Sequence, residues 1–432
     1  MRHIIKTQVI FYDFAQGGIM KYLIIGSGGR EHTLAWRLLH DSSASEVFAA
    51  PGNGGFEKAY RTGIGMHDYK EIVSFCIKNK IDVVIVGPEA PLVDGIVDVL
   101  QENKIPVFGP TRQGAMLEGS KLFAKNIMEK NNVPTGRHND FNDKNKILEY
   151  IESVTQFPIV IKLDGLAAGK GVGIPENKEE ALAFVEKNVI DGATVFIEEF
   201  FDGEEASVIG IADGDDIVTF VSAQDHKRIF ENDKGPNTGG MGAYGPAPIM
   251  TEERLQEVHD RVLMPTIRGM KQEGAPFKGI LYAGLIMVNN EMKVLEFNTR
   301  FGDPEAQVIL PLLEGKLGDV IESSLNGTIK NTQLTFKDQH AITVVMASGG
   351  YPGAYEKGKL ITGLDAVSND IIVFHAGTKE EDGKYYTNGG RVLNVTALGN
   401  TLQEARDKVY SEIDKISFEG AYYRKDIAHR AL

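Results

Sequence analysis

The segment at residues 294–305, VLEFNTRFGDPE, contains residue types that could hold a metal ion. It begins with the apolar content of a buried strand, yet Glu296 interrupts the run. Because side chains alternate between the two faces of a strand, we expect Glu296 and Asn298 on one face, about 7 Å apart along the backbone. Both side chains offer oxygen ligands, one of them anionic. This pair suits a hard cation such as Mg²⁺ that keeps substrate phosphate among its other ligands.

Arg300 follows the predicted metal ligands by two residues. An arginine beside a metal-binding carboxylate can grip a second anion through two parallel hydrogen bonds. The alternative is that Glu296 lies on a solvated edge and pairs with Arg300.

Composition limits the classes of function. The chain has 432 residues, enough for two to four domains, and a net charge of −14. The absence of a Lys/Arg-rich run argues against broad nucleic-acid or anionic-membrane binding. The one cysteine, Cys76, excludes an internal disulfide and a cysteine-based zinc site. A single cysteine fits a reducing cytosol, so we expect a cytoplasmic protein. No apolar run is long enough for a membrane span, and we expect the protein to be a monomer.

From Met20 onward, short apolar strands alternate with helical patterns. The expected strands are 22–25, 47–50, 83–86 and 107–108, and the expected helices are 30–40, 69–80 and 96–103. This alternation predicts a Rossmann-like parallel α/β sheet with ligands at the carboxyl ends of its strands. Residues 1–19 are expected to be an extension outside that fold.

The turn after the first strand, GSGGREH, partly matches a dinucleotide-binding fingerprint. Glu31 occupies the position of the third glycine, and the second strand ends without a carboxylate, which disfavours NAD. A helix N-terminus still favours a phosphate, and Arg30 adds positive charge. Glu89, in GPEAPL after the third strand, points into the same crevice or faces its own helix dipole.

Residues 158–163 form a predicted strand that carries Lys162, and the glycine-rich segment DGLAAGKGVG follows. The spacing of the glycines does not match a P-loop. A glycine-rich flap over a triphosphate, with Lys162 beneath it, would keep the phosphate-binding function. The alternative is a flexible hairpin tip.

The segment EEFFDGEE, at 198–205, connects predicted strands 193–197 and 206–211. Its backbone could bind an adenine edge, and Glu205 could accept hydrogen bonds from ribose hydroxyls. In QDHKR, at 224–228, a lone His226 is a poor zinc site, whereas Lys227 is suited to phosphate. No Ser-His-Asp or Cys-His arrangement supports a covalent intermediate.

Several segments occur in an order that resembles a known family. They are GSGGREH, GPEAPL, LEGSK, IKLDGLAAGKGV, IEEFFDGEEAS, QDHKR, GPNTGGMGAY, LEFNTRFGDPE, SGGYPGAYEKG and TNGGRVL. Together they resemble the phosphoribosylamine–glycine ligase family of the ATP-grasp superfamily, from Met20 to the C-terminus. The resemblance implies a multidomain α/β and α+β protein. Its predicted parts are an N-terminal extension at 1–19, a substrate domain at 20–137, a lid at 138–206, a central domain at 207–338 and a C-terminal domain at 339–432.

The resemblance also implies roles for individual residues. Catalytic roles are implied for Lys162, Arg300 and Lys227. ATP contacts are implied for Lys121, Lys162, Gly169, Lys170, Gly171, Glu198, Glu199, Phe201 and Glu205. Substrate contacts are implied for Gly28, Gly29, Arg30, Glu89, Asp225, Arg300 and Asp303. Glu296 and Asn298 would bind Mg²⁺ or Mn²⁺.

The implied substrates are ATP, glycine and 5-phosphoribosylamine, joined through glycyl phosphate to give glycinamide ribonucleotide, ADP and phosphate in purine biosynthesis. Strand 280–288 lacks the carboxylate that the wider superfamily often adds, which leaves the number of metal ions open. Two alternatives remain: another ATP-grasp ligase or carboxylase acting on a purine intermediate, and an ATP-binding sensor. Residues 339–432 are expected to pack against the central domain and wall the active site.

Overall fold

The structure is a computed structural model that describes residues 19–165, 171–190 and 192–432. Most of the expected N-terminal extension lies outside these residues. The predicted ATP contacts Gly169 and Lys170 also lie outside them.

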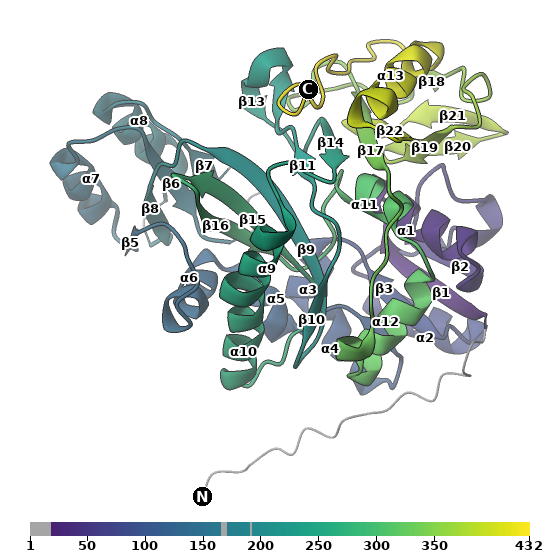
Figure 1. Ribbon diagram of the computed structural model, residues 1–432, viewed down its shortest axis with the longest axis horizontal. Coiled ribbons are helices and arrows are strands. Elements are labelled where there is room, and N and C mark those ends of the chain that lie inside the picture. The colour runs from purple at the N-terminus through teal and green to yellow at the C-terminus, as the bar shows by residue number, and fades with distance from the viewer. Residues whose placement is uncertain (1–18, 166–170, 191) are drawn as a thin grey trace, which may run out of the picture.

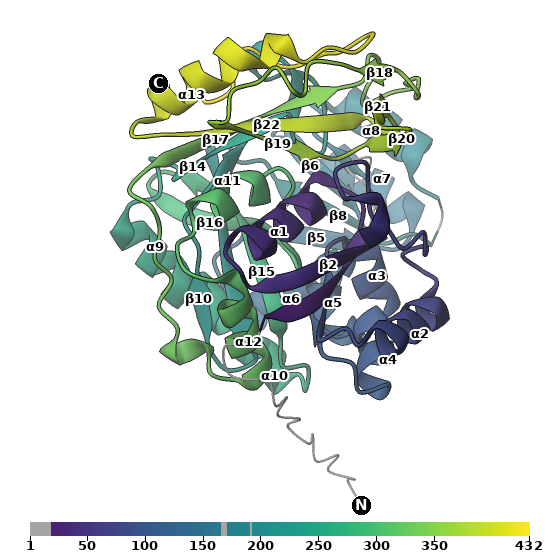
Figure 2. The ribbon, with the colours of Figure 1, turned by 90° about the vertical axis from the view of Figure 1, so that its right-hand side faces the viewer.

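The N-terminal part is a parallel sheet with strand order β2-β1-β3-β4, as the alternating pattern predicted. The strands are β1 (Met20–Gly26), β2 (Ala44–Pro51), β3 (Val83–Val86) and β4 (Val107–Phe108). The helices are α1 (Gly29–His40), α2 (Tyr69–Asn79), α3 (Glu89–Asp94), α4 (Ile96–Glu102) and α5 (Arg112–Gly119). Strand β3 and residues 22–25 of β1 are continuously apolar and buried, because helices cover the sheet (Figure 2).

A second sheet projects from one side of the molecule (Figure 1). It follows α6 (Lys121–Lys130) and has the order β5-β8-β6-β7, with neighbouring strands antiparallel. Its strands are β5 (His138–Phe141), β6 (Ile159–Leu163), β7 (Val172–Gly173) and β8 (Val195–Glu199). Helices α7 (Lys144–Ser153) and α8 (Lys178–Asn188) share its own small apolar core.

The central sheet is antiparallel with the order β10-β9-β15-β16. Its strands are β9 (Glu204–Asp213), β10 (Ile217–Thr219), β15 (Lys278–Val288) and β16 (Glu291–Asn298). Helices α9 (Glu252–Val258) and α10 (Met264–Gln272) precede β15, and α11 (Ala306–Leu312) and α12 (Leu317–Asn326) follow β16.

A five-stranded antiparallel sheet, β11-β14-β17-β22-β19, joins the C-terminal part to earlier segments. Its strands are β11 (Gln224–Asp225), β14 (Gly242–Gly245), β17 (His340–Ala347), β19 (Ile371–His375) and β22 (Arg391–Gly399). The remaining strands are β12 (Arg228–Phe230), β13 (Lys234–Asn237), β18 (Leu360–Ile361), β20 (Thr378–Glu381) and β21 (Lys384–Thr387), and the last α-helix is α13 (Leu402–Glu412). The sheet therefore combines strands from both sides of residue 339, where the sequence predicts a domain boundary.

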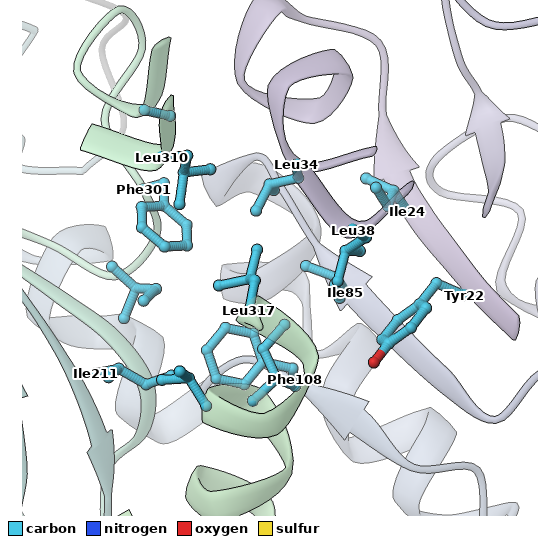
Figure 3. Packing of buried hydrophobic residues seen from close by; sticks show 14 of the residues in the cluster. Tyr22, Ile24, Leu34, Leu38, Ile85, Phe108, Ile211, Phe301, Leu310 and Leu317 are labelled. Atoms are coloured by element: carbon cyan, nitrogen blue, oxygen red, sulfur yellow. The ribbon is translucent and has the colours of Figure 1, made fainter. Parts of the chain in front are cut away.

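One apolar cluster locks the parallel sheet onto the segment that follows β16. Leu34 and Leu38 of α1 pack near Phe301, Leu310 and Leu317 (Figure 3). Each of these side chains is buried. Because Phe301 follows Arg300 directly, this core sets where Arg300 stands relative to the carboxyl ends of the parallel strands.

Candidate active site

The two predicted metal ligands lie at the end of β16. Asn298 pairs with Tyr282 and Glu296 pairs with Gly284 on the neighbouring strand β15. The partners are two residues apart, so the two ligands share a face of the sheet. A Cβ on Gly284 would stand 3.2 Å from Cγ of Glu296, so this glycine leaves room for the carboxylate side chain.

A β-bulge precedes Glu296. The pairing register shifts between Gly284 and Leu285, which leaves Leu295 as the extra residue on β16. Nζ of Lys162 donates to the Leu295 carbonyl oxygen at 3.3 Å and to Oε2 of Glu198 at 3.0 Å. The bulge thus places the Lys162 ammonium group beside the strand that carries the predicted metal ligands.

Two further lysines face Glu296. Nζ of Lys121 donates to the Gly165 carbonyl oxygen at 2.9 Å, and burial lowers the pKa of this lysine although Glu296 opposes the shift. Nζ of Lys227 lies 2.7 Å from Oε2 of Glu205. Burial of Lys227 opposes its charge, but the carboxylates around it, Glu296 among them, raise the pKa of Lys227 well above the ordinary value. Glu296 is thus exposed and lies near lysine ammonium groups that other carboxylates also surround.

Asp225, at the end of β11, belongs to the same group of charges. Burial raises the pKa of its carboxyl group to about 7, with Lys227 pulling in the opposite direction. Burial thus disfavours the charged form of this carboxyl group, whereas the Lys227 ammonium favours it.

Arg300 contacts two carboxylates and the predicted metal amide. Its Nη2 lies 2.9 Å from Oε1 of Glu118 and 3.2 Å from Oδ1 of Asn298, and its Nε lies 3.4 Å from Oε2 of Glu89. These carboxylates raise the pKa of the guanidinium although burial opposes its charge. Within the described residues, Arg300 forms ion pairs with Glu118 and Glu89. The alternative pairing of Arg300 with Glu296 is not found among the ion pairs of these residues.

The turn before α1 has its donors occupied by carboxylates of the chain itself. Oε2 of Glu31 accepts from the Gly28 amide at 2.5 Å, and Oε1 of Glu31 lies 2.7 Å from Nε of Arg30. Oδ2 of Asp303 accepts from the Arg30 amide at 3.3 Å. The predicted substrate residues Gly28, Arg30 and Asp303 are therefore neighbours. Gly29, the first residue of α1, lies between them.

The predicted adenine segment begins at the end of β8 and ends on the first residues of β9, where Glu205 lies. Glu198 is buried, whereas Oε1 of Glu199 accepts from the Arg137 amide at 2.9 Å. The ammonium of Lys293 lies 4.4 Å from the ring centroid of Phe201. Gly171 precedes β7, and its carbonyl accepts from the Leu163 amide at 2.8 Å, so the start of the glycine-rich segment pairs with the Lys162 strand.

Sequence reasoning missed two residues that contact this site. Oε2 of Glu118 accepts from the Thr299 amide at 2.7 Å, and Nη1 of Arg391 donates to the Gly239 and Asp303 carbonyl oxygens at 2.6 Å each. Both residues lie inside motifs that carried the family resemblance, LEGSK and TNGGRVL. That was the only signal, because both contacts join segments far apart in the chain.

The residues at the end of β16 fit a divalent metal ion of the Mg²⁺ type. They offer one carboxylate and one amide oxygen on the same face of the strand. Among the described residues, no group of three or more His, Cys, Asp or Glu could hold a metal ion. A cation here would therefore take its remaining ligands from water and substrate, which is how Mg²⁺ is usually held.

Family profiles match three consecutive stretches of the chain. They are described as the N domain, the ATP-grasp (A) domain and the C domain of phosphoribosylglycinamide synthetase, and they match residues 20–118, 119–306 and 341–430. The chain belongs to the phosphoribosylglycinamide synthetase family. The structure also has no helix, within its described residues, that is long and apolar enough to cross a membrane.

Relatives in this family match nearly the whole chain. A phosphoribosylamine–glycine ligase of Caldanaerobacter subterraneus is 46% identical over 95% of this chain and 99% of its own length. The human trifunctional purine biosynthetic protein adenosine-3 is 47% identical over 95% of this chain, which corresponds to 42% of that longer protein.

Solved structures show the same fold. The crystal structure of phosphoribosylamine–glycine ligase from Thermotoga maritima has a TM-score of 0.80 at 35% identity, covering 94% of this chain and 100% of that one. The biotin carboxylase domain of a Hydrogenobacter thermophilus 2-oxoglutarate carboxylase has a TM-score of 0.68 at 15% identity, covering 94% of this chain and 92% of that one. This second likeness concerns the fold alone, and it confirms the predicted multidomain α/β architecture.

Proposed function

We propose that the chain joins glycine to 5-phosphoribosylamine with the consumption of ATP. A carboxylate oxygen of glycine attacks the γ-phosphorus of ATP, which releases ADP and forms glycyl phosphate. The amine of phosphoribosylamine then attacks the acyl carbon, phosphate leaves, and the new amide nitrogen loses a proton. The observation that carries this proposal is the group of three lysines and one arginine around Glu296 and Asn298.

This arrangement suits phosphoryl transfer because such a reaction needs positioned positive charge more than a protein nucleophile. In the proposal Lys121 and Lys162 bind ATP phosphates, and Lys227 and Arg300 face the group in transfer. Asp225 and Asp303 lie near the amino acid and the amine, with Gly28, Gly29, Arg30 and Glu89 on the phosphoribosylamine side. Gly171, Glu198, Glu199, Phe201 and Glu205 complete the nucleotide contacts, together with Gly169 and Lys170 from the undescribed part of the loop.

Mg²⁺ or Mn²⁺ is the proposed metal, with Glu296 and Asn298 as its protein ligands. When bound, it would neutralise charge on the phosphate oxygens of ATP. The chain's own residues then hold the phosphates, orient the glycine carboxylate and exclude water from the acyl phosphate.

The direct test is ADP release by the purified protein in the presence of Mg²⁺. Sustained release is expected only when ATP, glycine and phosphoribosylamine are all present, and each is omitted in turn. An ATP-grasp enzyme for another purine intermediate would not respond to glycine, and an ATP-binding sensor would release no ADP with any combination. Absence of ADP and of an amide product with all three present would refute the proposal.

Three further expectations concern the domain borders, the oligomeric state and the location of the protein. The division at residues 20–137, 138–206, 207–338 and 339–432 is the proposed domain plan, and limited proteolysis would test its borders. We propose a monomer, because most of the exposed large apolar side chains that the structure describes come from different segments of the chain. Light scattering of the purified chain tests this. A cytoplasmic location fits the buried thiol of Cys76, which needs no oxidising compartment.

A further inference from the structure

Glu118 is a buried carboxylate with three partners on the segment that follows β16. Its Oε2 accepts from the Thr299 amide at 2.7 Å and from the Thr299 hydroxyl at 3.1 Å. Its Oε1 lies 2.9 Å from Nη2 of Arg300, and its side chain is only 7% exposed. The Glu118 carboxylate therefore contacts the backbone amide of Thr299 and the side chains of both Thr299 and Arg300.

The position of Glu118 connects two parts of the proposed site. It is near the end of α5, and α6 begins three residues after it, with Ser120 as its N-cap and Lys121 as its first residue. Its partner Thr299 stands between Asn298 and Arg300. The carboxylate thus ties the start of the helix that carries Lys121 to the strand end that carries the proposed metal amide.

The two carboxylates on Arg300 differ in how firmly they are held. Glu118 has further bonds to Thr299, whereas Glu89 lies at the longer distance of 3.4 Å and its side chain is 36% exposed. An incoming substrate anion can displace the exposed carboxylate at small cost. Displacing the buried one would leave both its charge and the Thr299 amide without partners.

We propose that Glu118 is a positioning residue for the reaction, since it fixes the Arg300 guanidinium and, through Thr299, the backbone next to Asn298. Glu89 is then the exchangeable partner of Arg300 on the substrate side. This role rests on the proposed function, because it gives Arg300 a defined place against the group in transfer.

Glu118→Gln removes the charge but keeps an oxygen that can accept from Thr299. Glu89 then becomes the one acidic partner of Arg300 in this set of contacts, so the guanidinium is drawn toward it. A small displacement of a catalytic group costs up to about 10²-fold in rate, so we expect kcat to fall on that order while KM for ATP stays within about twofold.

Asp41 offers a matched control. This buried carboxylate lies 3.2 Å from Nε of Arg37 and accepts from the Leu317 amide at 2.8 Å, so it too joins an arginine to a distant backbone amide. Asp41 lies at one end of α1, and the turn that contains Gly28 lies at the other end, about 18 Å away by helix rise. Asp41→Asn should lower the unfolding temperature to a similar extent and leave kcat unchanged.

The experiment measures kcat, KM for ATP and unfolding temperature for the parent and both variants. A selective loss of kcat in Glu118→Gln supports the positioning role. An unchanged kcat in that variant, or an equal loss in Asp41→Asn, overturns it. If Glu118→Gln does not fold, Glu118→Asp decides. Aspartate keeps the negative charge but is one methylene shorter, so its carboxylate lies further from Arg300 and Thr299. If Glu118 positions these residues, kcat must fall in Glu118→Asp, and full activity refutes the role. A parent that releases no ADP refutes the proposed function, and this role with it.

Discussion

Arg391 and Asp303 meet across the site: Nη1 of the arginine donates to the Asp303 carbonyl oxygen at 2.6 Å and lies 3.5 Å from Oδ1 of the same residue. The same nitrogen donates to the Gly239 carbonyl oxygen at 2.6 Å. One guanidinium from β22 therefore holds the glycine-rich loop before β14 against the segment after β16. Through these contacts the C-terminal part takes part in shaping the proposed active site.

Arg391→Ala should lower kcat/KM for the ligation by about 10- to 100-fold, because hydrogen bonds from a charged donor to the two loops are lost. Arg406→Ala is the control, since Arg406 also donates to two backbone carbonyls, those of Ile427 and Lys425, on the C-terminal tail. Steady-state kinetics of both variants check the prediction. Equal activity of the two would argue against a role for Arg391 in the site.

Lys162→Ala should lower kcat/KM on the order of 10²- to 10³-fold, as for the loss of one preorganised electrostatic donor. The reason is that its ammonium lies beside the bulge at Leu295, next to the proposed metal ligands. ADP release under saturating glycine measures the effect. The exposed Lys130, paired with Glu273, is the control position. Unchanged turnover in Lys162→Ala would remove this lysine from the mechanism.

Glu296→Gln should raise the Mg²⁺ concentration needed for half-maximal activity without unfolding the protein, because an amide oxygen binds a hard cation less strongly than a carboxylate does. Glu291→Gln is the matched control on the same strand, and both residues are exposed. Activity titrations with Mg²⁺ compare the two variants. A normal requirement in Glu296→Gln would exclude the ligand role.

His32 should make stability depend on pH. Its Nδ1 accepts from the His375 amide at 3.0 Å and its Nε2 lies 3.1 Å from the Gly55 carbonyl oxygen, which requires a neutral ring with the proton on Nε2. Burial lowers the pKa of His32 from 6.5 to about 4. The unfolded chain therefore takes up a proton first, so this contribution is complete above pH 6.5 and is lost as the pH falls toward 4.

In His32→Asn the drop in unfolding free energy between pH 7.5 and pH 5 should be smaller than in the parent by about 1–2 kcal/mol. Urea denaturation at the two pH values measures it. His67→Asn, at an exposed histidine, should behave like the parent. An equal pH dependence in the His32 variant would show that the ring is not held neutral.

The sequence by itself determined the elements and the residue types of the site. Continuous apolar runs such as the one after Met20 predicted the parallel strands, because a strand covered on both faces has no polar alternation. The order of the motifs predicted the family. The two-residue spacing of Glu296 and Asn298 predicted a common face, because that depends only on the local geometry of a strand.

Only the tertiary structure decided which charges meet. Glu118 and Thr299 are 181 residues apart, and Arg391 and Asp303 are 88 apart, so no local period relates them. The pairing of β14 with β17 and the bulge at Leu295 are likewise set by how the sheets pack and register against each other. Such contacts form only when shared apolar cores hold the sheets and helices in fixed positions relative to each other. A sequence pattern indicates only which face each element buries.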